Sequence, residues 1–189
     1  MTPELRDFVG AFRSATFRSA SAPGVVSERT LLAAREAAES VRFEARDLAH
    51  LGRYEHAPLL LPPFALDELC GIAASAAGRP VTIRSQTLFR LRAGDYTLTA
   101  DDESRTSGFA PDEPFLDLTL DVSPDATGEA EVVFTHGPVS CFTVTQRPGE
   151  LGLAERTIAN GRYDRYLTHR VGERVVTRLR LLLSLPVSR

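Results

Sequence analysis

Apolar residues follow two different rhythms along this chain, and the change comes near residue 78. Before that point they recur every three or four positions, which is typical of one face of an α-helix. After it they alternate with polar residues, and Val, Thr, Phe and Leu replace Ala and Glu, which favours β-strands. We therefore expect a single domain over 1–189, in which residues 1–78 are mainly helical support and residues 79–189 form a jelly-roll core.

The first part contains three predicted helices. Ser27 is the kind of residue that caps a helix N-terminus, and Gly78 is the kind that follows a helix C-terminus. Between these helices, residues 42–65 mix strand and loop character and end at a Pro-Pro pair. The predicted helices span residues 3–20, 27–40 and 65–78.

The second part reads as a series of short strands separated by turn-rich segments such as "SPDATG", "THGP" and "RPGE". Many short strands at this spacing indicate an antiparallel sandwich or jelly roll. The expected fold class is α+β: a double-stranded β-helix, cupin-like, with the N-terminal helices packed on one sheet. The predicted strands span residues 80–92, 95–100, 115–122, 130–135, 140–145, 151–156, 164–171 and 174–185.

The composition argues against nucleic acid and membranes as partners. The net charge of -3 gives no electrostatic footprint for nucleic acid, and no run of about 20 apolar residues suggests a membrane span. The start of the chain has no apolar signal-peptide core, so we expect a cytoplasmic protein. Cys70 and Cys141 form no CxxC pair and are expected to be buried reduced thiols. An edge strand or the first helix would permit a homodimer.

The last predicted strand carries the first candidate chemistry. Its alternation places Arg178 and Arg180 on one face of an otherwise apolar segment. A guanidinium buried inside a barrel must be paired, because an unpaired charge in a low dielectric costs several kcal/mol. Three interpretations follow: the face points to solvent, a carboxylate such as Asp117 or Asp121 neutralises the arginines, or the arginines form a bidentate fork for an anionic ligand.

A second candidate is the stretch "LRAGDYTLTADDE", residues 91–103, which ends in Asp101, Asp102 and Glu103. Clustered carboxylates at a strand end indicate either a solvated loop or a metal site. His169 precedes Arg178 by nine residues, and hairpin geometry would bring the two to one cavity. The loop at 102–114 that follows the acids is either a lid or, as we expect, a surface loop.

These segments resemble those of the Fe(II) and 2-oxoglutarate-dependent dioxygenases, in their prolyl-hydroxylase-like branch. "FRLRAGDYTLTAD" is similar to the family's strand, turn, Tyr and His-x-Asp, and "HRVGERVVTRLRLLLSL" is similar to its His-x-Val followed by a basic residue and a closing strand. The resemblance covers roughly residues 66–185. It implies a hydroxylase-like oxygenase that uses Fe(II) and 2-oxoglutarate and acts on an unknown substrate, whether a small molecule or a protein.

Carried over by position, the resemblance implies a role for four residues. Asp101 would be the metal carboxylate and His169 the distal metal histidine. Arg178 would bind the far carboxylate of 2-oxoglutarate, and Tyr96 would point into the cavity beside it. Two imidazoles and one carboxylate leave three positions on iron for a 2-oxo acid and dioxygen.

The sequence departs from the family at the first metal histidine, where Thr99 stands instead. Shifting the register to use Asp102 places Ala100 there, and no other histidine (His50, His56 or His136) lies at the motif. Three hypotheses remain: an oxygenase that holds its metal through Asp101, His169 and a substitute such as Asp102; a catalytically inactive oxygenase-fold protein that serves as a small-molecule binding or assembly module; and an unrelated jelly-roll binding protein.

Overall fold

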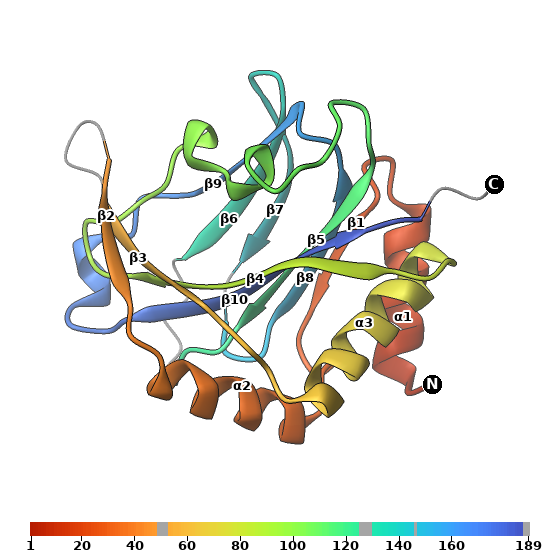
Figure 1. Ribbon diagram of the computed structural model, residues 1–189, viewed down its shortest axis with the longest axis horizontal. Coiled ribbons are helices and arrows are strands. Elements are labelled where there is room, and N and C mark those ends of the chain that lie inside the picture. Colours follow the sequence, from red (N-terminus) through yellow and green to blue (C-terminus); the bar gives the residue numbers. More distant parts are fainter. Residues whose placement is uncertain (49–52, 125–129, 146, 187–189) are drawn as a thin grey trace.

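The computed structural model describes residues 1–48, 53–124, 130–145 and 147–186, and Figure 1 shows their arrangement. Two antiparallel sheets and three α-helices make up the fold. The helices are α1 (Pro3–Ser14), α2 (Glu28–Ser40) and α3 (Pro63–Ala77). The strands are β1 (Ser19–Ala22), β2 (Glu44–Asp47), β3 (Arg53–Pro58), β4 (Thr82–Leu91), β5 (Phe115–Asp121), β6 (Glu131–His136), β7 (Val139–Thr145), β8 (Leu151–Arg156), β9 (Asn160–Asp164) and β10 (Val176–Ser184).

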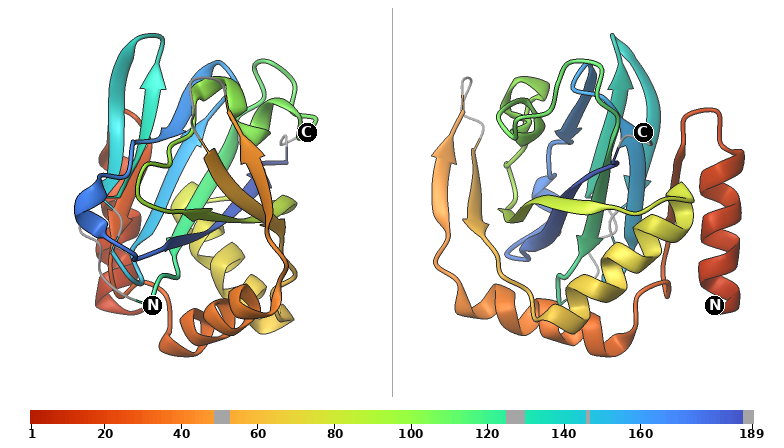
Figure 2. Two further views of the ribbon diagram at one scale, coloured as in Figure 1. Left: turned by 90° about the vertical axis from the view of Figure 1, so that its left-hand side faces the viewer. Right: turned by 45° about the vertical axis from the view of Figure 1, so that its right-hand side comes forward.

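The strands form a jelly roll, as expected. One sheet has the order β1-β8-β5-β10-β4-β3-β2 and the other has the order β7-β6-β9, and all paired strands are antiparallel. The two sheets face each other, because the side chain of Arg162 on β9 approaches Asp117 on β5. The inner faces of both sheets therefore enclose a common interior, which Figure 2 shows from two sides.

The three helices lie on the outer face of the larger sheet, which confirms the expected packing (Figure 1). Alternate leucines of β10 point to this side and are fully buried against the apolar stripes of the helices. Phe8 and Phe12 of α1 and Leu69 and Ile72 of α3 belong to the same cluster. Burial of apolar area on this face supplies the main driving force for folding.

The helix ends follow the predicted chemistry. The Ser27 hydroxyl accepts a hydrogen bond from the Thr30 amide at 3.3 Å and caps α2. Gly78 ends α3 in the left-handed conformation, with φ of 72°, where a residue without a Cβ meets little strain. Helix α3 begins two residues earlier than expected, at Pro63, because proline is well tolerated in the first helical turn.

Three predicted elements differ from the structure. The first helix stops at Ser14, and Ser19–Ala22 instead pairs with β8 as β1. Residues 95–100 form no strand: they run beside β9, where the Thr97 amide donates to the Asp164 carbonyl at 3.1 Å, and end in the short 3-10 helix η2 (Thr99–Asp101). The strand predicted at 164–171 lies earlier, at Asn160–Asp164.

Other expectations also need correction. The first 78 residues supply β1, β2 and β3 to the larger sheet in addition to the helices. Both cysteines are free, but Cys70 is only half-buried and Cys141 is exposed on β7. His50 lies outside the described residues. Within the described part of the chain, every helix is too short or too polar to cross a bilayer.

Candidate functional site

Buried arginines occupy the inner face of the larger sheet. Arg178 and Arg180 alternate with the outward leucines of β10, as predicted, and each is only 1% exposed. Arg156, at the end of β8, points to the same interior and is 2% exposed. Arg162 reaches it from β9 on the opposite sheet and is 3% exposed. Four guanidinium groups therefore share an interior that must also hold their counter-charges.

Asp117 is the centre of the largest ion-pair cluster. It lies on β5, diagonal to Arg180 on β10 and to Arg156 on β8. Nε and Nη2 of Arg180 donate to the two oxygens of Asp117 at 3.0 and 2.6 Å. Nε and Nη2 of Arg156 both donate to its Oδ2, at 3.0 and 2.7 Å. One fully buried carboxylate thus binds two guanidinium forks, and this confirms the interpretation that Asp117 neutralises the strand's arginines.

Asp102 joins this cluster from the loop that follows η2. Its Oδ1 accepts from Nη2 of Arg180 at 2.8 Å, and its Oδ2 lies 2.8 Å from Nη2 of Arg156. It also caps the short 3-10 helix η3 (Glu103–Arg105) by accepting from the Ser104 amide. The loop at 102–114 is therefore anchored at its start, and it is anchored again where Phe109 stacks on Phe115. It is more deeply packed than the expected surface loop.

A second cluster forms around Asp164, at the end of β9. Arg178 donates through Nη1 to Asp164 Oδ1, and Arg162 donates through Nη1 to Oδ2 at 3.2 Å. The Thr97 hydroxyl donates to the same carboxylate at 2.9 Å. Arg162 links the two clusters, because its Nε lies 3.8 Å from Asp117 Oδ2.

The arginines keep three of the interior carboxylates ionised. Burial acts to raise the pKa of Asp102 and Asp117, but attraction to Arg180 and Arg156 outweighs it and lowers both values. The pKa of Asp164 is lowered in the same way by Arg162 and Arg178. Asp121 differs: burial dominates over its contacts with Ser123 and the charge of Arg178, and its pKa is raised.

Some polar atoms of this interior have no hydrogen-bond partner among the described residues. They are Nε and Nη2 of Arg162, Nε of Arg178 and the hydroxyl of Thr119. A buried donor without an acceptor costs about 1–3 kcal/mol, so these positions are suited to ordered water.

The residues singled out by the family resemblance differ in their surroundings. His169 is exposed in the 3-10 helix η4 (His169–Val171), where its Nε2 is 3.0 Å from the Tyr166 hydroxyl. Arg178 is buried and bound to Asp164. The backbone of Asp101 ends η2, and its side chain lies outside the described part of the structure. The roles assigned to these residues stay predictions.

Tyr96 and the remaining histidines add no metal donor next to His169. Tyr96 packs 6.4 Å from the Tyr166 ring and lines a small pocket of about 290 Å³ with Asp164 and Tyr163. His56 packs against Tyr54, and His136 Nδ1 is 3.1 Å from the Asn160 amide nitrogen. Among the side chains that the structure describes, no three from His, Cys, Asp and Glu are grouped to hold a metal ion.

Sequence reasoning missed Arg156, Arg162 and Asp164. A signal was present in "NGRYD", where Arg162 and Asp164 alternate with Tyr163, whereas "LGLAER" ends in two adjacent charged residues. Recognising it requires the correct bounds of β9, which the prediction placed four residues too late.

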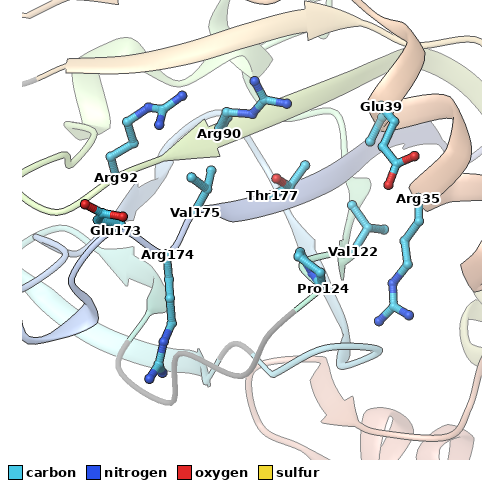
Figure 3. A pocket seen from close by; sticks show the side chains of 11 residues that line it. Arg35, Glu39, Arg90, Arg92, Val122, Pro124, Glu173, Arg174, Val175 and Thr177 are labelled. Carbon is cyan, nitrogen blue, oxygen red and sulfur yellow. The ribbon is translucent and has the colours of Figure 1, made fainter.

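A separate pocket of about 370 Å³ opens on the outer face of the larger sheet, where α2 meets the ends of β4 and β5 and the start of β10. Figure 3 shows its lining. The side chains that line it are Arg35, Ala38, Glu39, Arg90, Arg92, Val122, Pro124, Glu173, Arg174, Val175 and Thr177.

Solved structures with the same fold include several oxygenases. A 2OG-Fe(II) oxygenase family oxidoreductase from Burkholderia pseudomallei superposes with a TM-score of 0.67 at 14% identity, over 95% of this chain and 90% of that one. The non-heme alpha ketoglutarate-dependent carbocyclase SnoK from nogalamycin biosynthesis gives 0.68 at 15% identity, over 95% and 83%. HygX from Streptomyces hygroscopicus, with nickel and 2-oxoglutarate bound, gives 0.62 at 14% identity, over 95% and 87%.

Sequence comparisons add no further relative. No family model matches the chain, and no curated protein matches it. At these identities the structural likeness shows a shared jelly-roll fold, while the chemistry has to be argued from the side chains of this chain.

Proposed function

We propose that this protein has the oxygenase fold without an oxygenase iron centre and serves as a metal-independent small-molecule binding module. One observation carries the proposal: the interior carboxylates Asp102, Asp117 and Asp164 are each bound by arginines. The resemblance to the prolyl-hydroxylase-like branch is then a resemblance of scaffold, with Thr99 at the place of the first metal histidine.

The described residues do not fit an iron ion. A non-heme Fe(II) centre takes two imidazoles and one carboxylate on one face of the metal, and the described side chains provide no such group. Asp102, the substitute carboxylate considered above, already accepts from Arg180 and lies 2.8 Å from Arg156. A divalent cation could take up these carboxylates only by breaking their ion pairs with the buried guanidinium groups, which would leave those charges unpaired.

A second candidate function is a divergent oxygenase, and the likeness to HygX with nickel and 2-oxoglutarate bound favours it. In that case Asp101 and His169 would hold Fe(II), and Arg178 and Tyr96 would contact 2-oxoglutarate. It requires His169 to leave Tyr166 and turn toward Asp101.

Metal titration separates the two candidates. Purified protein is titrated with Fe(II) or Mn(II) without oxygen, and succinate release from 2-oxoglutarate is then measured in air. We expect no stoichiometric metal binding and no succinate above the protein-free level. Stoichiometric binding that His169→Ala abolishes, together with succinate release, would instead establish the oxygenase.

The variant Thr99→His sharpens this test because it restores the missing motif residue. We expect it to fold and to bind no more metal than Thr106→His, a control that adds a histidine to an exposed position of the neighbouring loop. A stoichiometric site in Thr99→His alone would show that Asp101 and His169 already face each other, and the metal-independent proposal would fail.

A further inference from the structure

The pocket on the outer face of the larger sheet is physically separate from the arginine–aspartate interior. Thr177 and Arg90 are register partners on β10 and β4, so both point outward toward α2. Their neighbour Arg178 points to the opposite face of the same sheet. A ligand in this pocket would therefore sit under α2, one sheet thickness away from the barrel interior.

The lining of the pocket is basic although the chain is acidic overall. Four arginines and two glutamates line it, whereas the whole chain carries a net charge of -3. Figure 3 shows Arg90 and Arg92 along one side of the opening, Glu173 and Arg174 below Arg92, and Arg35 at the opposite end beside Glu39. The apolar residues Val122, Pro124 and Val175 lie between these two sides with Thr177.

On the first side, one carboxylate faces two guanidinium groups. Glu55 Oε2 lies 3.7 Å from Arg90 Nη1 and 3.6 Å from Arg92 Nη2, which is beyond hydrogen-bond distance in both cases. The Arg90 guanidinium is also fixed over the Phe43 ring at 3.7 Å. The two arginines of this side face Glu55 and, in Figure 3, Glu173 beside Arg92. Because Glu55 accepts no hydrogen bond from either arginine, their N–H groups can still donate to an anion, and the aromatic ring holds Arg90 in place.

On the second side, Arg35 is fixed by the backbone. Its Nη2 donates to the Ser123 carbonyl at 3.2 Å. Its Nε is buried and has no partner in the part of the chain that the structure describes. A carbonyl takes up no charge, and burial disfavours the ionised form of Asp121, the carboxyl on which the charge of Arg35 acts. The guanidinium therefore keeps an unused N–H donor, which favours an anion next to it.

We infer that this pocket binds a small organic dianion, with an oxyanion group at each end of an apolar middle. The two arginine sides would each take one carboxylate or phosphate group, since guanidinium groups bind both in a fork. Val122 and Val175 would contact the carbon skeleton. A volume of about 370 Å³ suits an organic molecule better than a bare inorganic ion. The inference holds whether or not the barrel interior binds a metal.

Isothermal titration calorimetry without added metal tests the charge and size requirements. The probes are glutarate and 1,3-propanediol bisphosphate, which each have an anionic group at both ends of a three-carbon chain and are dianions in the sense of having two such groups. Butyrate and inorganic phosphate, with one such group each, are the comparisons. We expect at least one of the dianions to bind at least tenfold more tightly than both comparisons, and its affinity to fall as sodium chloride is raised. The better dianion tells whether carboxylate or phosphate is the natural group.

Alanine variants of the arginines that line the pocket test where the ligand binds. Arg35→Ala and Arg92→Ala should each weaken binding of the better dianion about tenfold. Arg84→Ala is the matched control, because Arg84 is an exposed arginine of the same strand β4, outside the pocket, and should leave affinity unchanged. Absence of binding by both dianions at 10 mM, equal binding of butyrate, or full affinity in the Arg35 and Arg92 variants would each overturn the inference.

Discussion

The two faces of β10 are equally buried but are built from opposite chemistry. Leu179, Leu181 and Leu183 point outward into the core beneath the helices, and Arg178 and Arg180 point inward among aspartates. The outer face gains free energy from every apolar group that leaves water. The inner face gains only if each charge finds its partner, because desolvation of an ion pair costs about as much as its attraction returns. Equally buried residues on the two faces therefore do not contribute equally to the free energy of folding.

This difference also bears on specificity. An apolar core accepts another apolar residue of similar volume at little cost. A network in which one carboxylate binds two guanidinium groups tolerates almost no substitution, because removal of any one side chain leaves a buried charge without a partner. The inner face should therefore be the more fragile of the two to single substitutions, even though it contributes less to folding overall.

The largest expected effect is that of Asp117→Ala. Its loss leaves Arg156 and Arg180 without their main counter-charge, and removing one partner of a buried ion pair costs about 3–5 kcal/mol. Urea denaturation followed by circular dichroism measures the change. If the alanine variant is unfolded, Asp117→Asn, which keeps the shape and one acceptor, should be folded and destabilised by a smaller amount. A loss below about 1 kcal/mol in both variants would mean that the network is not electrostatically coupled.

Leu181→Ala tests the outer face on β10, at a residue that is as fully buried as Asp117. The deletion leaves a cavity in a fully buried apolar cluster, and such changes cost about 2–5 kcal/mol. We place it slightly below Asp117→Ala, at about 3 kcal/mol. The two variants should also differ in kind: the pH dependence of stability should stay as in the wild type for Leu181→Ala and should flatten for Asp117→Ala. Identical pH profiles would remove the distinction between the faces.

Most residues of the outer face were predictable from sequence. On the inner face, the residues on β10 and β5 were predictable and those contributed by β9 were not. Alternation along β10 and β5 is a local pattern, so it gave the inward arginines and offered Asp117, the partner of Arg180, among the candidate carboxylates. Arg162 and Asp164 come from the opposite sheet, and their meeting with β10 depends on how the barrel closes, which no local pattern encodes. His169 is a separate case. Sequence proximity to Arg178 suggests a shared cavity, and the structure shows Leu167 and Val171 buried with His169 exposed between them, so its role as a metal ligand stays a prediction.

Acid should weaken the inner face before the outer one. Asp102, Asp117 and Asp164 have pKa values below their unfolded value of about 3.9. The folded chain thus binds fewer protons than the unfolded chain in this range, so the stabilisation is fully present above about pH 5 and is lost as the pH falls through 4 and below. A difference of one in a pKa corresponds to about 1.4 kcal/mol.

Asp121 should act in the opposite direction. Because burial raises its pKa, its ionised form is disfavoured in the folded protein, and stability falls as the pH rises from about 4 through its raised value. The variant Asp121→Asn should therefore gain stability relative to the wild type between pH 5 and 7. Urea midpoints from pH 3 to 8 test both statements. A wild-type midpoint that stays constant down to pH 3 would contradict the first, and an Asn variant less stable at pH 7 would contradict the second.

The smallest effect should come from an ion pair that lies outside both faces. Arg165 and Glu131 pair across β9 and β6 with an arginine side chain that is 55% exposed. Exposed pairs contribute about 0.2–1 kcal/mol, because water solvates both charges when the partner is removed. Arg165→Ala should thus change the urea midpoint by no more than about a third of the shift in Asp117→Ala, and 0.5 M salt should remove even that. A loss comparable to that of Asp117→Ala would show that charge count, rather than burial, governs the contribution of ion pairs in this protein.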